Sequence, residues 1–468
     1  MSNPGTADNP LRVAVVGCGP SGFYVADAVL KTPGLVAQVD MFDRLPTPYG
    51  LVRYGVAPDH QEVKRVTKVY AKTAEHPSVR WFGGVEFGKH LTMDDVRAHY
   101  HAVAFTTGAQ TDRRLDIPGE DLQGSHPATQ FVAWYNGHPD CRHLSFDLST
   151  ERAVVIGVGN VAIDVARMLC RTPDELAKTD IADYALEALR KSRVREVLLV
   201  GRRGPAQAAF SPKEIEEIAE LPDVDVLVTP AEAALDPLSA AWLEKEGARS
   251  QQRNVKFLQE HASAAGTGKP KQLRCRFLVG PTELRGSSGK LQTIRVQHMT
   301  LVADPDGTPR PQARDSFEDL PVDLVFKAIG YRGVPVPGVP FDQKKGIVPN
   351  VDGRVHDKVG GVPVPGYYAS GWCKRGPTGL IGTNSLDAKA TVEAMKVDRD
   401  KGLLLAGNRG DIVGLLQQRG VDVATWADWQ RLDAWEQAEG KRLGKLRQKL
   451  TSIDAMMQRV RALRPAAK

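Results

Sequence analysis

The sequence contains no apolar run long enough to cross a membrane. A transmembrane helix requires about 20 consecutive apolar residues, and no segment of the 468-residue chain approaches that length. The first ten residues, MSNPGTADNP, lack both the apolar centre of a signal peptide and the arginines of a transit peptide. We therefore expect a protein that does not bind membranes and is located in the cytoplasm.

Cysteines are few and widely spaced. No two of them have the CxxC spacing that is typical of zinc and iron–sulfur ligands. Their odd number and scatter also do not fit a disulfide framework. We expect no metal site in this chain, so any iron–sulfur chemistry belongs to another protein. The five cysteines are Cys18, Cys141, Cys170, Cys275 and Cys373.

The charge balance is mild, with a net charge of +6. It favours an acidic partner over a basic one. No zinc-finger or RNA-recognition pattern is present, so we expect no nucleic-acid partner. The hydrophobic fraction of 42% and the charged fraction of 25% are ordinary for a globular protein. The length predicts two or three domains.

A glycine motif, GCGPSG (17–22), follows the β-rich run LRVAVVG and precedes the helical run FYVADAVLK. Gly17 permits a tight turn, Gly19 lets the backbone approach a pyrophosphate, and Gly22 lets the helix pack against the strand. Pro20 and Ser21 begin the helix, whose free N–H groups face the phosphates. The next apolar run ends at Asp43, where an acid accepts ribose hydroxyls. The motif predicts a dinucleotide site and leaves FAD and NAD open.

A second motif, GVGNVA (157–162), follows the strand RAVVI, and Ala162 takes the place of the third glycine. The later strand VREVLLV ends at GRRG (201–204), where Arg202 and Arg203 replace the usual ribose-binding acid. Guanidinium groups suit a phosphate, so the site is predicted to prefer NADPH over NADH. The alternative is that both arginines are solvated surface charges. The long gap between the motif and the arginines predicts an insertion over 171–193 with a helix at DYALEALRK.

Two further strands, within 101–110 and 324–333, are expected to carry the chain out of the first domain and back into it. We expect the domain of the first nucleotide to consist of two parts, 1–110 and 331–468, the second of which ends in a helical tail. The domain of the second nucleotide is expected to comprise 111–330. After the return, YYASGW (367–372) leads into a glycine-rich loop and the helical run LDAKATVEAMK. Such a loop and helix suit a flavin, which Trp372 would border or stack upon. Alternatively, Trp372 is a buried core residue.

Four long segments resemble the adrenodoxin reductase family of ferredoxin–NADP reductases: LPTPYGLVRYGVAPDH (45–60), GNVAIDVAR (159–167), GRRGPAQAAF (201–210) and GWCKRGPTGLIGTN (371–384). The resemblance spans almost the whole chain. It implies an α/β protein with two Rossmann-like, three-layer domains of the glutathione-reductase type, with FAD in the first and NADP in the second. It also implies an oxidoreductase in which hydride passes from NADPH to N5 of FAD, and single electrons then pass to a ferredoxin-type iron–sulfur protein.

The resemblance also assigns site residues. The FAD contacts it implies are Ser21, Asp43, Leu51, Val85, Trp372 and the backbone of Gly379, Leu380 and Ile381. The NADP contacts it implies are Gly159, Asn160, Val161 and Ala162, with the 2′-phosphate on Arg202 and Arg203, a ribose or nicotinamide-side contact from Glu214, and Gly379 touching the nicotinamide.

Two positions depart from the family. Asp43 stands where the family usually has Glu, so a water bridge or weaker FAD binding is expected there. Cys373 replaces an aliphatic residue beside Trp372. It is interpreted as inert packing, with an oxidation-sensitive thiol as the alternative.

Hydride transfer requires no general base, because the cofactors carry the chemistry. We expect His60 and Asp164 to relay a proton or order the ring, together with Glu214 on the nicotinamide side. His60 is equally well explained as a surface or packing histidine.

The sequence gives little information on the surface that would bind the electron acceptor. Arg249, Arg253 and Lys256 form a basic stretch that would suit an acidic ferredoxin, although such a stretch is more often a solvated face. The tail 401–468 is predicted to be helical and to pack on the FAD domain, with core roles for its tryptophans Trp426, Trp429 and Trp435.

Three other functions share part of this sequence pattern. A disulfide reductase needs a cysteine pair near the flavin, and Cys18 has no partner at a suitable spacing. Another NADPH-dependent flavoprotein, such as a monooxygenase or diaphorase, shares the two nucleotide sites but not the GWCKRGPTG segment. A non-enzymatic NADP-binding redox sensor would lack bound flavin.

Overall fold

The computed structural model describes residues 3–262, 266–407 and 410–465. The chain divides into two compact units. Unit 1 comprises Met1–Thr111, Asn136–Asp140 and Gly330–Lys468, and unit 2 comprises Asp112–Tyr135 and Cys141–Ile329. No helix within the described ranges is both long enough and apolar enough to cross a membrane.

Unit 1 is built on a seven-stranded sheet of order β16-β17-β18-β4-β1-β2-β3. The central strands are almost fully buried, because helices or loops cover both faces, and they are therefore rich in Val, Ala and Phe. The parallel strands are β1 (Leu11–Val16), β2 (Ala37–Asp43), β3 (Val79–Gly83), β4 (Ala102–Phe105) and β18 (Pro363–Ala369), and the antiparallel edge is β17 (Arg354–His356) and β16 (Asn350–Val351).

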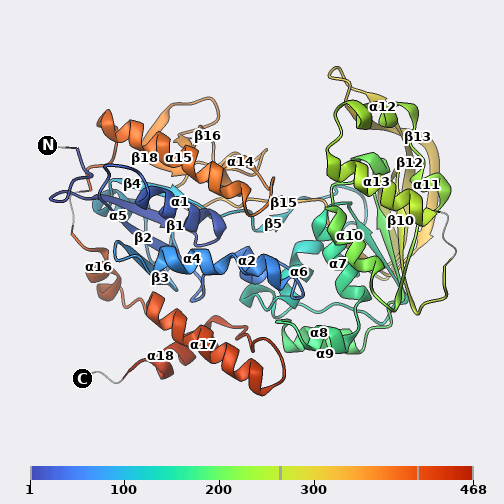
Figure 1. Ribbon diagram of the computed structural model, residues 1–468, viewed down its shortest axis with the longest axis horizontal. Coiled ribbons are helices and arrows are strands. Elements are labelled where there is room, and N and C mark those ends of the chain that lie inside the picture. Colours follow the sequence, from blue (N-terminus) through green and yellow to red (C-terminus); the bar gives the residue numbers. More distant parts are fainter. Residues whose placement is uncertain (1–2, 263–265, 408–409, 466–468) are drawn as a thin grey trace. The chain divides into compact units, whose positions relative to one another are not determined.

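Two helices from distant parts of the chain pack together over this sheet (Figure 1). They are α1 (Pro20–Leu30), which follows the first glycine motif, and α15 (Thr383–Asp400), which follows the glycine-rich loop. Both helices were predicted. The remaining helices of unit 1 before the tail are α2 (Leu51–Tyr54), α3 (Gln61–Lys64), α4 (Thr67–Ala74), α5 (Met93–His99) and α14 (Trp372–Arg375).

The tail forms α16 (Ile412–Gln418), α17 (Trp426–Arg442) and α18 (Ile453–Leu463), and α17 and α18 pack against each other (Figure 1). Trp429 is buried in the same core as Phe23 and Tyr70, while Trp426 and Trp435 pack against that core. The predicted core role of the three tryptophans is confirmed.

Unit 2 contains a six-stranded, all-parallel sheet of order β6-β14-β7-β8-β10-β9. Helix α9 (Asp183–Arg190) confirms the helix predicted within the insertion, and α8 (Pro173–Ala177) is a second helix that was not predicted. The strands are β6 (Ser125–Pro127), β7 (Arg152–Ile156), β8 (Glu196–Val200), β9 (Val224–Leu227), β10 (Lys271–Arg276) and β14 (Leu324–Lys327), and the helices are α6 (Ala128–Tyr135), α7 (Asn160–Cys170), α8 (Pro173–Ala177), α9 (Asp183–Arg190), α10 (Pro212–Ala219), α11 (Pro230–Ala233), α12 (Pro237–Lys245) and α13 (Arg249–Ala262).

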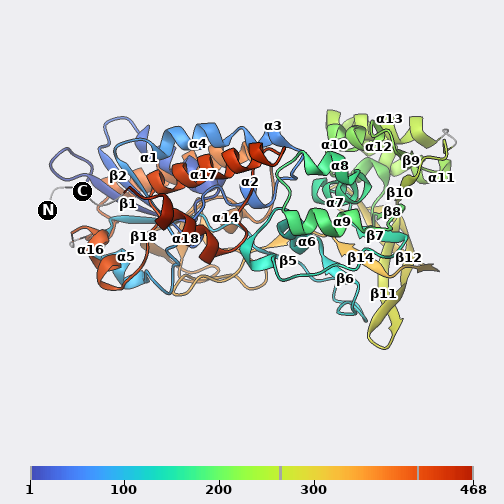
Figure 2. The same ribbon diagram turned by 90° about the horizontal axis from the view of Figure 1, so that it is seen from below.

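A three-stranded antiparallel sheet, which the sequence analysis did not anticipate, completes unit 2 (Figure 2). Its strands are β11 (Val279–Ser287), β12 (Lys290–Ala303) and β13 (Pro309–Pro321). Ile294 and Val296 of β12 share a core with Val154 and Leu198 of the parallel sheet. Helices, parallel sheet and antiparallel sheet thus give unit 2 three layers, in agreement with the predicted fold class.

Candidate functional site

The first glycine motif forms a turn at the carboxyl end of β1. Gly17 has a φ of +100°, and a Cβ placed there would lie 2.8 Å from the carbonyl oxygen of Thr106. A Cβ on Gly22 would lie 2.2 Å from the carbonyl oxygen of Gly17. At Gly19, by contrast, the nearest atom would be 3.9 Å away, on Gly50. Packing requires Gly17 and Gly22, whereas Gly19 leaves room for a ligand.

The helix that follows this turn has a free N-terminus. Pro20 occupies its first turn, and within the described part of the chain no side chain caps it at Gly19. The second motif repeats this arrangement at α7, whose N-cap is Gly159 and which also lacks a side-chain cap within those residues. By contrast, α5 begins with a Thr capping box. Uncapped N–H groups and the helix dipole suit an anion such as a pyrophosphate.

Asp43 closes the first turn from β2. Its Oδ2 accepts the N–H of Cys18 at 2.9 Å, and its Oδ1 accepts the N–H of Leu45 at 3.0 Å. Burial raises the pKa of Asp43, while the two N–H groups act in the opposite direction. The carboxylate therefore shapes the turn itself, a role that the sequence did not reveal. Its predicted ribose contact stays a prediction.

Two of the other predicted FAD residues lie beside this turn. Leu51 follows Gly50, where a Cβ would lie 3.0 Å from the Cα of Gly19. Val85 is buried, and its N–H donates to the carbonyl oxygen of Asp43 at 2.9 Å. The fold thus brings Leu51 and Val85 to the same turn as Asp43, although Leu51 and Val85 are 34 positions apart in the sequence.

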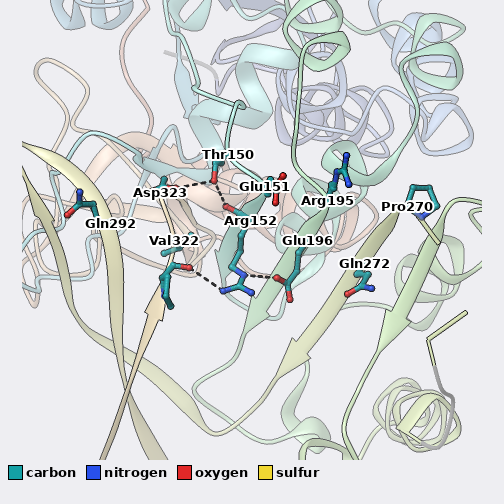
Figure 3. Close-up of a pocket in the computed structure, with 11 residues that line it drawn as sticks. Thr150, Glu151, Arg152, Arg195, Glu196, Pro270, Gln272, Gln292, Val322 and Asp323 are labelled. Carbon is teal, nitrogen blue, oxygen red and sulfur yellow. Dashed lines mark hydrogen bonds and ion pairs between the residues drawn. The ribbon is translucent and has the colours of Figure 1, made fainter. Parts of the chain in front are cut away.

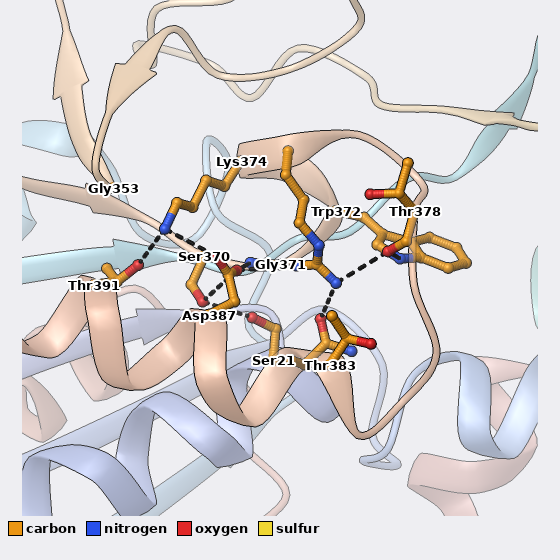
Figure 4. Close-up of polar contacts among 12 residues, drawn as sticks. Ser21, Gly353, Ser370, Gly371, Trp372, Lys374, Thr378, Thr383, Asp387 and Thr391 are labelled. Carbon is orange, nitrogen blue, oxygen red and sulfur yellow. Dashed lines mark hydrogen bonds and ion pairs between the residues drawn. The ribbon is translucent and has the colours of Figure 1, made fainter. Parts of the chain in front are cut away.

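The glycine-rich loop belongs to the C-terminal part of unit 1 and contacts the helix that follows the first turn (Figure 4). Ser21 and Ser370 are joined by a 3.1 Å bond between their hydroxyl groups. Trp372 is half-buried, and its Nε1 donates to the carbonyl oxygen of Thr378 at 3.1 Å. The centroid of its ring lies 5.2 Å from the centroid of the Tyr331 ring. Its exposure argues against the alternative of a core tryptophan.

The backbone positions Gly379, Leu380 and Ile381 form the end of that loop, immediately before α15. Gly379 has a φ of +78°, and the N–H of Leu380 donates to Thr383 Oγ1 at 3.1 Å. The Leu380 side chain is 68% exposed. An apolar side chain this exposed suits a surface that a planar ring covers.

The second glycine motif resembles the first in geometry. A Cβ on Gly157, whose φ is +138°, would lie 2.3 Å from the carbonyl oxygen of Ala328. Around Gly159 the described residues leave open space within 4 Å. Asn160 Oδ1 accepts the N–H of Ser211 at 2.7 Å, so this side chain braces the neighbouring loop. Ala162 is buried, and Val161 is half-buried.

Arg202 and Arg203 are exposed at the carboxyl end of β8. The side chain of Arg202 packs against Gly280. A Cβ added to Gly280 would lie 3.2 Å from Arg202 Cγ. Partial burial lowers the pKa of Arg203, and repulsion from Arg202 and Arg310 adds to that shift. Mutually repelling cations favour binding of an anion between them. Arg310 lies on β13, a strand that was not predicted, and no local pattern could have identified it.

Asp164 and Glu214 share one partner. The buried Arg167 donates to Asp164 Oδ1 at 2.6 Å and to Glu214 Oε2 at 2.8 Å, which links α7 to α10. The sequence suggested both acids but not this link. His60 lies in unit 1 as the N-cap of α3, and its predicted role stays a prediction.

The buried thiol of Cys373 donates to the carbonyl oxygens of Phe105 at 3.0 Å and Ser370 at 3.2 Å. Burial raises its pKa. Both facts favour the packing interpretation over an oxidation-sensitive thiol. None of the five cysteines, all of which lie in the described ranges, forms a disulfide.

The basic stretch on α13 is partly neutralised. Arg253 pairs with Glu216 at 2.8 Å, and Lys256 pairs with Glu260 at 3.7 Å. These ion pairs fit a solvated face, and a ferredoxin contact there stays a prediction.

A hollow of about 610 Å³ in unit 2 is a different feature (Figure 3). It lies at the amino ends of β7, β8 and β10, where Arg152 pairs with Glu196 at 2.6 Å. In parallel sheets nucleotides bind at the carboxyl ends of the strands. The hollow is therefore not the dinucleotide site.

Comparison with known proteins agrees with this geometry. A family model described as pyridine nucleotide-disulphide oxidoreductase matches residues 11–263. The chain is 44% identical to NADPH-ferredoxin reductase FprA of Mycobacterium tuberculosis, over 96% of this chain and 99% of the relative. It is 41% identical to the mitochondrial NADPH:adrenodoxin oxidoreductase of Homo sapiens, over 97% and 92%. The solved structure of Mycobacterium tuberculosis FprA in complex with NADPH superposes with a TM-score of 0.88, at 42% identity and with coverage of 96% and 99%.

Proposed function

The chain belongs to the adrenodoxin-reductase type of the pyridine nucleotide-disulphide oxidoreductases, and we propose that it is an FAD-dependent NADPH–ferredoxin reductase. The single observation that supports this most directly is the pair of uncapped glycine turns, each at the carboxyl end of a parallel strand, with an arginine pair beside the second. Two such turns accommodate two dinucleotides, and the arginines select the one with an extra phosphate.

The residues of unit 1 fit FAD. The open space over Gly19 admits a pyrophosphate, and the half-buried Trp372 and exposed Leu380 offer an apolar border for a ring. We assign the cofactor contacts to Ser21, Asp43, Leu51, Val85, Trp372 and the 379–381 backbone. Bound FAD supplies the chemistry that side chains lack, because it accepts a hydride and releases electrons singly.

The residues of unit 2 fit NADPH. Gly159 and the N-terminus of α7 suit the pyrophosphate, and Arg202 and Arg203 suit the 2′-phosphate, with Arg310 adding positive charge. Arg167 holds the carboxylates of Asp164 and Glu214 in fixed positions. We propose that these carboxylates orient the nicotinamide half of NADPH rather than abstract a proton, since hydride transfer needs no base.

The partner is a ferredoxin-type protein, and we further propose that it is acidic, because the chain carries a net charge of +6. A disulfide reductase activity is disfavoured, because Cys18 and Cys373 are both buried and unpaired.

The test begins with the visible spectrum of the purified protein, where bound flavin gives its characteristic absorption. Steady-state rates with NADPH and NADH are then compared, with an artificial dye and with an acidic ferredoxin as acceptors. A colourless protein that oxidises neither nucleotide contradicts the proposal. A basic ferredoxin that is reduced as fast as an acidic one contradicts only the charge preference.

A further inference from the structure

One carboxylate in unit 1 collects four donors near the glycine-rich loop (Figure 4). Asp387, on the second turn of α15, accepts on Oδ2 the N–H of Gly371 at 2.5 Å, the hydroxyl of Ser370 at 3.2 Å and Nη1 of Arg375 at 2.9 Å. Its Oδ1 pairs with Nζ of Lys374 at 2.8 Å. The Asp387 side chain is only 11% exposed. Such a set of charge-assisted bonds fixes every group that takes part.

The first group so fixed is the turn at Gly371. Gly371 has a φ of +78° and is the N-cap of α14, and a Cβ there would lie 2.6 Å from Ser21 Oγ. Ser21 belongs to the first glycine motif. Asp387 therefore connects α15 to the turn that precedes Trp372 and, through that turn, to the N-terminus of α1.

The second group is the guanidinium of Arg375. While Nη1 binds Asp387, Nη2 donates to the carbonyl oxygen of Thr378 at 3.1 Å and to Asn384 Oδ1 at 3.0 Å. Thr378 also accepts the Trp372 indole N–H at 3.1 Å. Arg375 thus contacts Thr378 within the 376–382 loop and Asn384 just beyond it, and Asp387 sets the direction in which its guanidinium points.

The charges add a further feature. One carboxylate faces two cations, and among the described residues the second partner of the Lys374 ammonium is the neutral Thr391 hydroxyl, at 3.1 Å. Removal of the carboxylate would leave two poorly solvated positive charges beside the loop. An unpaired, partly buried charge disturbs its surroundings more than an exposed one does.

We propose that Asp387 is a positioning residue for the flavin, which it serves by fixing the Gly371–Trp372 turn and by orienting Arg375 along the 376–382 loop. The inference rests on the proposed function, since it presumes that unit 1 holds FAD. Asp387 acts through Gly371 and Arg375 and is not assigned a cofactor contact of its own.

The test uses Asp387→Asn in the full-length protein, with Asp398→Asn as its matched control. Asp398 lies on the same helix, is 12% exposed, and accepts bonds from Arg354 Nε at 2.8 Å and from the Tyr368 hydroxyl at 2.9 Å, away from the glycine turns. The measurements are the FAD dissociation constant, the midpoint potential of the bound flavin, and thermal unfolding of the apoprotein.

Asp387→Asn is expected to weaken FAD binding by roughly tenfold or more, which is the effect of losing a charged hydrogen bond. It should also shift the midpoint potential to more positive values, because uncompensated cations favour the electron-rich reduced flavin. Asp398→Asn should lower the unfolding temperature without either change. Equal losses of FAD affinity in the two variants, or no loss in either, overturn the proposal.

A second variant, Arg375→Lys, tests the proposal independently if Asp387→Asn does not fold. Arg375→Lys keeps the positive charge but loses the bonds that Nη2 donates to Thr378 and Asn384, so it should also weaken FAD binding. Unchanged FAD binding in Arg375→Lys overturns the proposal that Asp387 acts on the flavin site through Arg375. A wild-type protein without flavin contradicts the proposed function itself, which distinguishes the two failures.

Discussion

Arg53 and Glu436 form a buried, two-bond ion pair, although they lie on α2 and on the tail helix α17. Arg53 Nη1 and Nη2 donate to the Glu436 oxygens at 2.9 and 2.6 Å, and the Glu436 side chain is 0% exposed. Arg447 adds a third bond to Glu436 at 3.0 Å. The pair holds the tail against the segment that contains Leu51.

Glu436→Gln is expected to destabilise the protein by about 3 kcal/mol, because it leaves the buried Arg53 guanidinium without its counter-charge, whereas Arg447 keeps its ion pair with Asp433 at 2.6 Å. Urea unfolding followed by tryptophan fluorescence measures the change, since Trp429 lies in the core beside this pair. The control is Glu439→Gln on the same helix, where the acid is 26% exposed and pairs locally with Arg442 at 2.6 Å, and which should shift the unfolding midpoint far less. If the two variants unfold at the same urea concentration, the pair contributes no net stability.

The nucleotide preference is expected to depend on Arg202 and Arg203. The Arg202→Ala, Arg203→Ala double variant loses two guanidinium groups, each of which forms a charged bond worth about 1.5–3 kcal/mol. The ratio of kcat/KM for NADPH to that for NADH should therefore fall by roughly two orders of magnitude. Most of the loss should appear in KM for NADPH, because the 2′-phosphate is remote from the reacting ring.

Two single variants on β13 refine this test. Arg310→Gln should raise KM for NADPH by only a few-fold, since Arg310 already pairs with Asp304 at 2.8 Å. Arg314→Gln, an exposed arginine on the same strand, should leave both nucleotides unaffected. An unchanged NADPH to NADH ratio in the double variant would show that the arginines are the solvated surface charges of the alternative interpretation.

The sequence was sufficient for the two glycine turns because their requirements are local. Gly17 and Gly157 need a positive φ, and Gly22 must lie against a backbone oxygen, so a short motif carries the information. By contrast, Asp387 acts through partners 12 to 17 residues earlier in the chain, and Arg310 lies on a strand that was not predicted. Their types and spacing resemble those of ordinary helix and strand residues, and only the folded chain shows what they contact.

The same reasoning explains the acids of unit 2. Asp164 and Glu214 were identified by resemblance, yet their common partner Arg167 was not singled out, because an arginine inside a helical run usually points to solvent. Its complete burial between α7 and α10 follows from the packing of two helices whose order along the chain does not reveal their contact.

His138 is expected to contribute a pH-dependent loss of stability. Burial, together with the nearby Arg44, lowers the pKa of His138 to about 4, although Asp140 acts in the opposite direction. An unfolded histidine has a pKa of about 6.5. Below that pH the unfolded chain binds a proton that the folded chain does not, so stability falls as pH decreases from about 6.5 and levels off near 4.

The measurement is the free energy of unfolding at several pH values between 4 and 7 for the wild type and for His138→Gln. The variant should reduce the slope by up to about 1.4 kcal/mol per pH unit, which corresponds to one proton. The matched comparison is His76→Gln, for a histidine on the surface of the same unit, which should retain the wild-type slope. An identical slope in His138→Gln would mean that other groups account for the acid sensitivity.

The two open glycines provide a test that separates the cofactor sites. Gly19→Ala and Gly159→Ala add a methyl group where the described residues leave open space, the nearest atom to a Gly19 Cβ being 3.9 Å away. Neither glycine has a positive φ, so the backbone tolerates alanine at both. The apoprotein of each variant should therefore unfold at the wild-type temperature. A methyl group at either turn would, however, occupy the space that a pyrophosphate needs.

Gly19→Ala should therefore lose FAD on purification but still bind 2′,5′-ADP. Gly159→Ala should keep its yellow flavin and show a KM for NADPH raised by roughly tenfold or more. Loss of flavin from the Gly159 variant, or retention by the Gly19 variant, would reverse the assignment of the two turns.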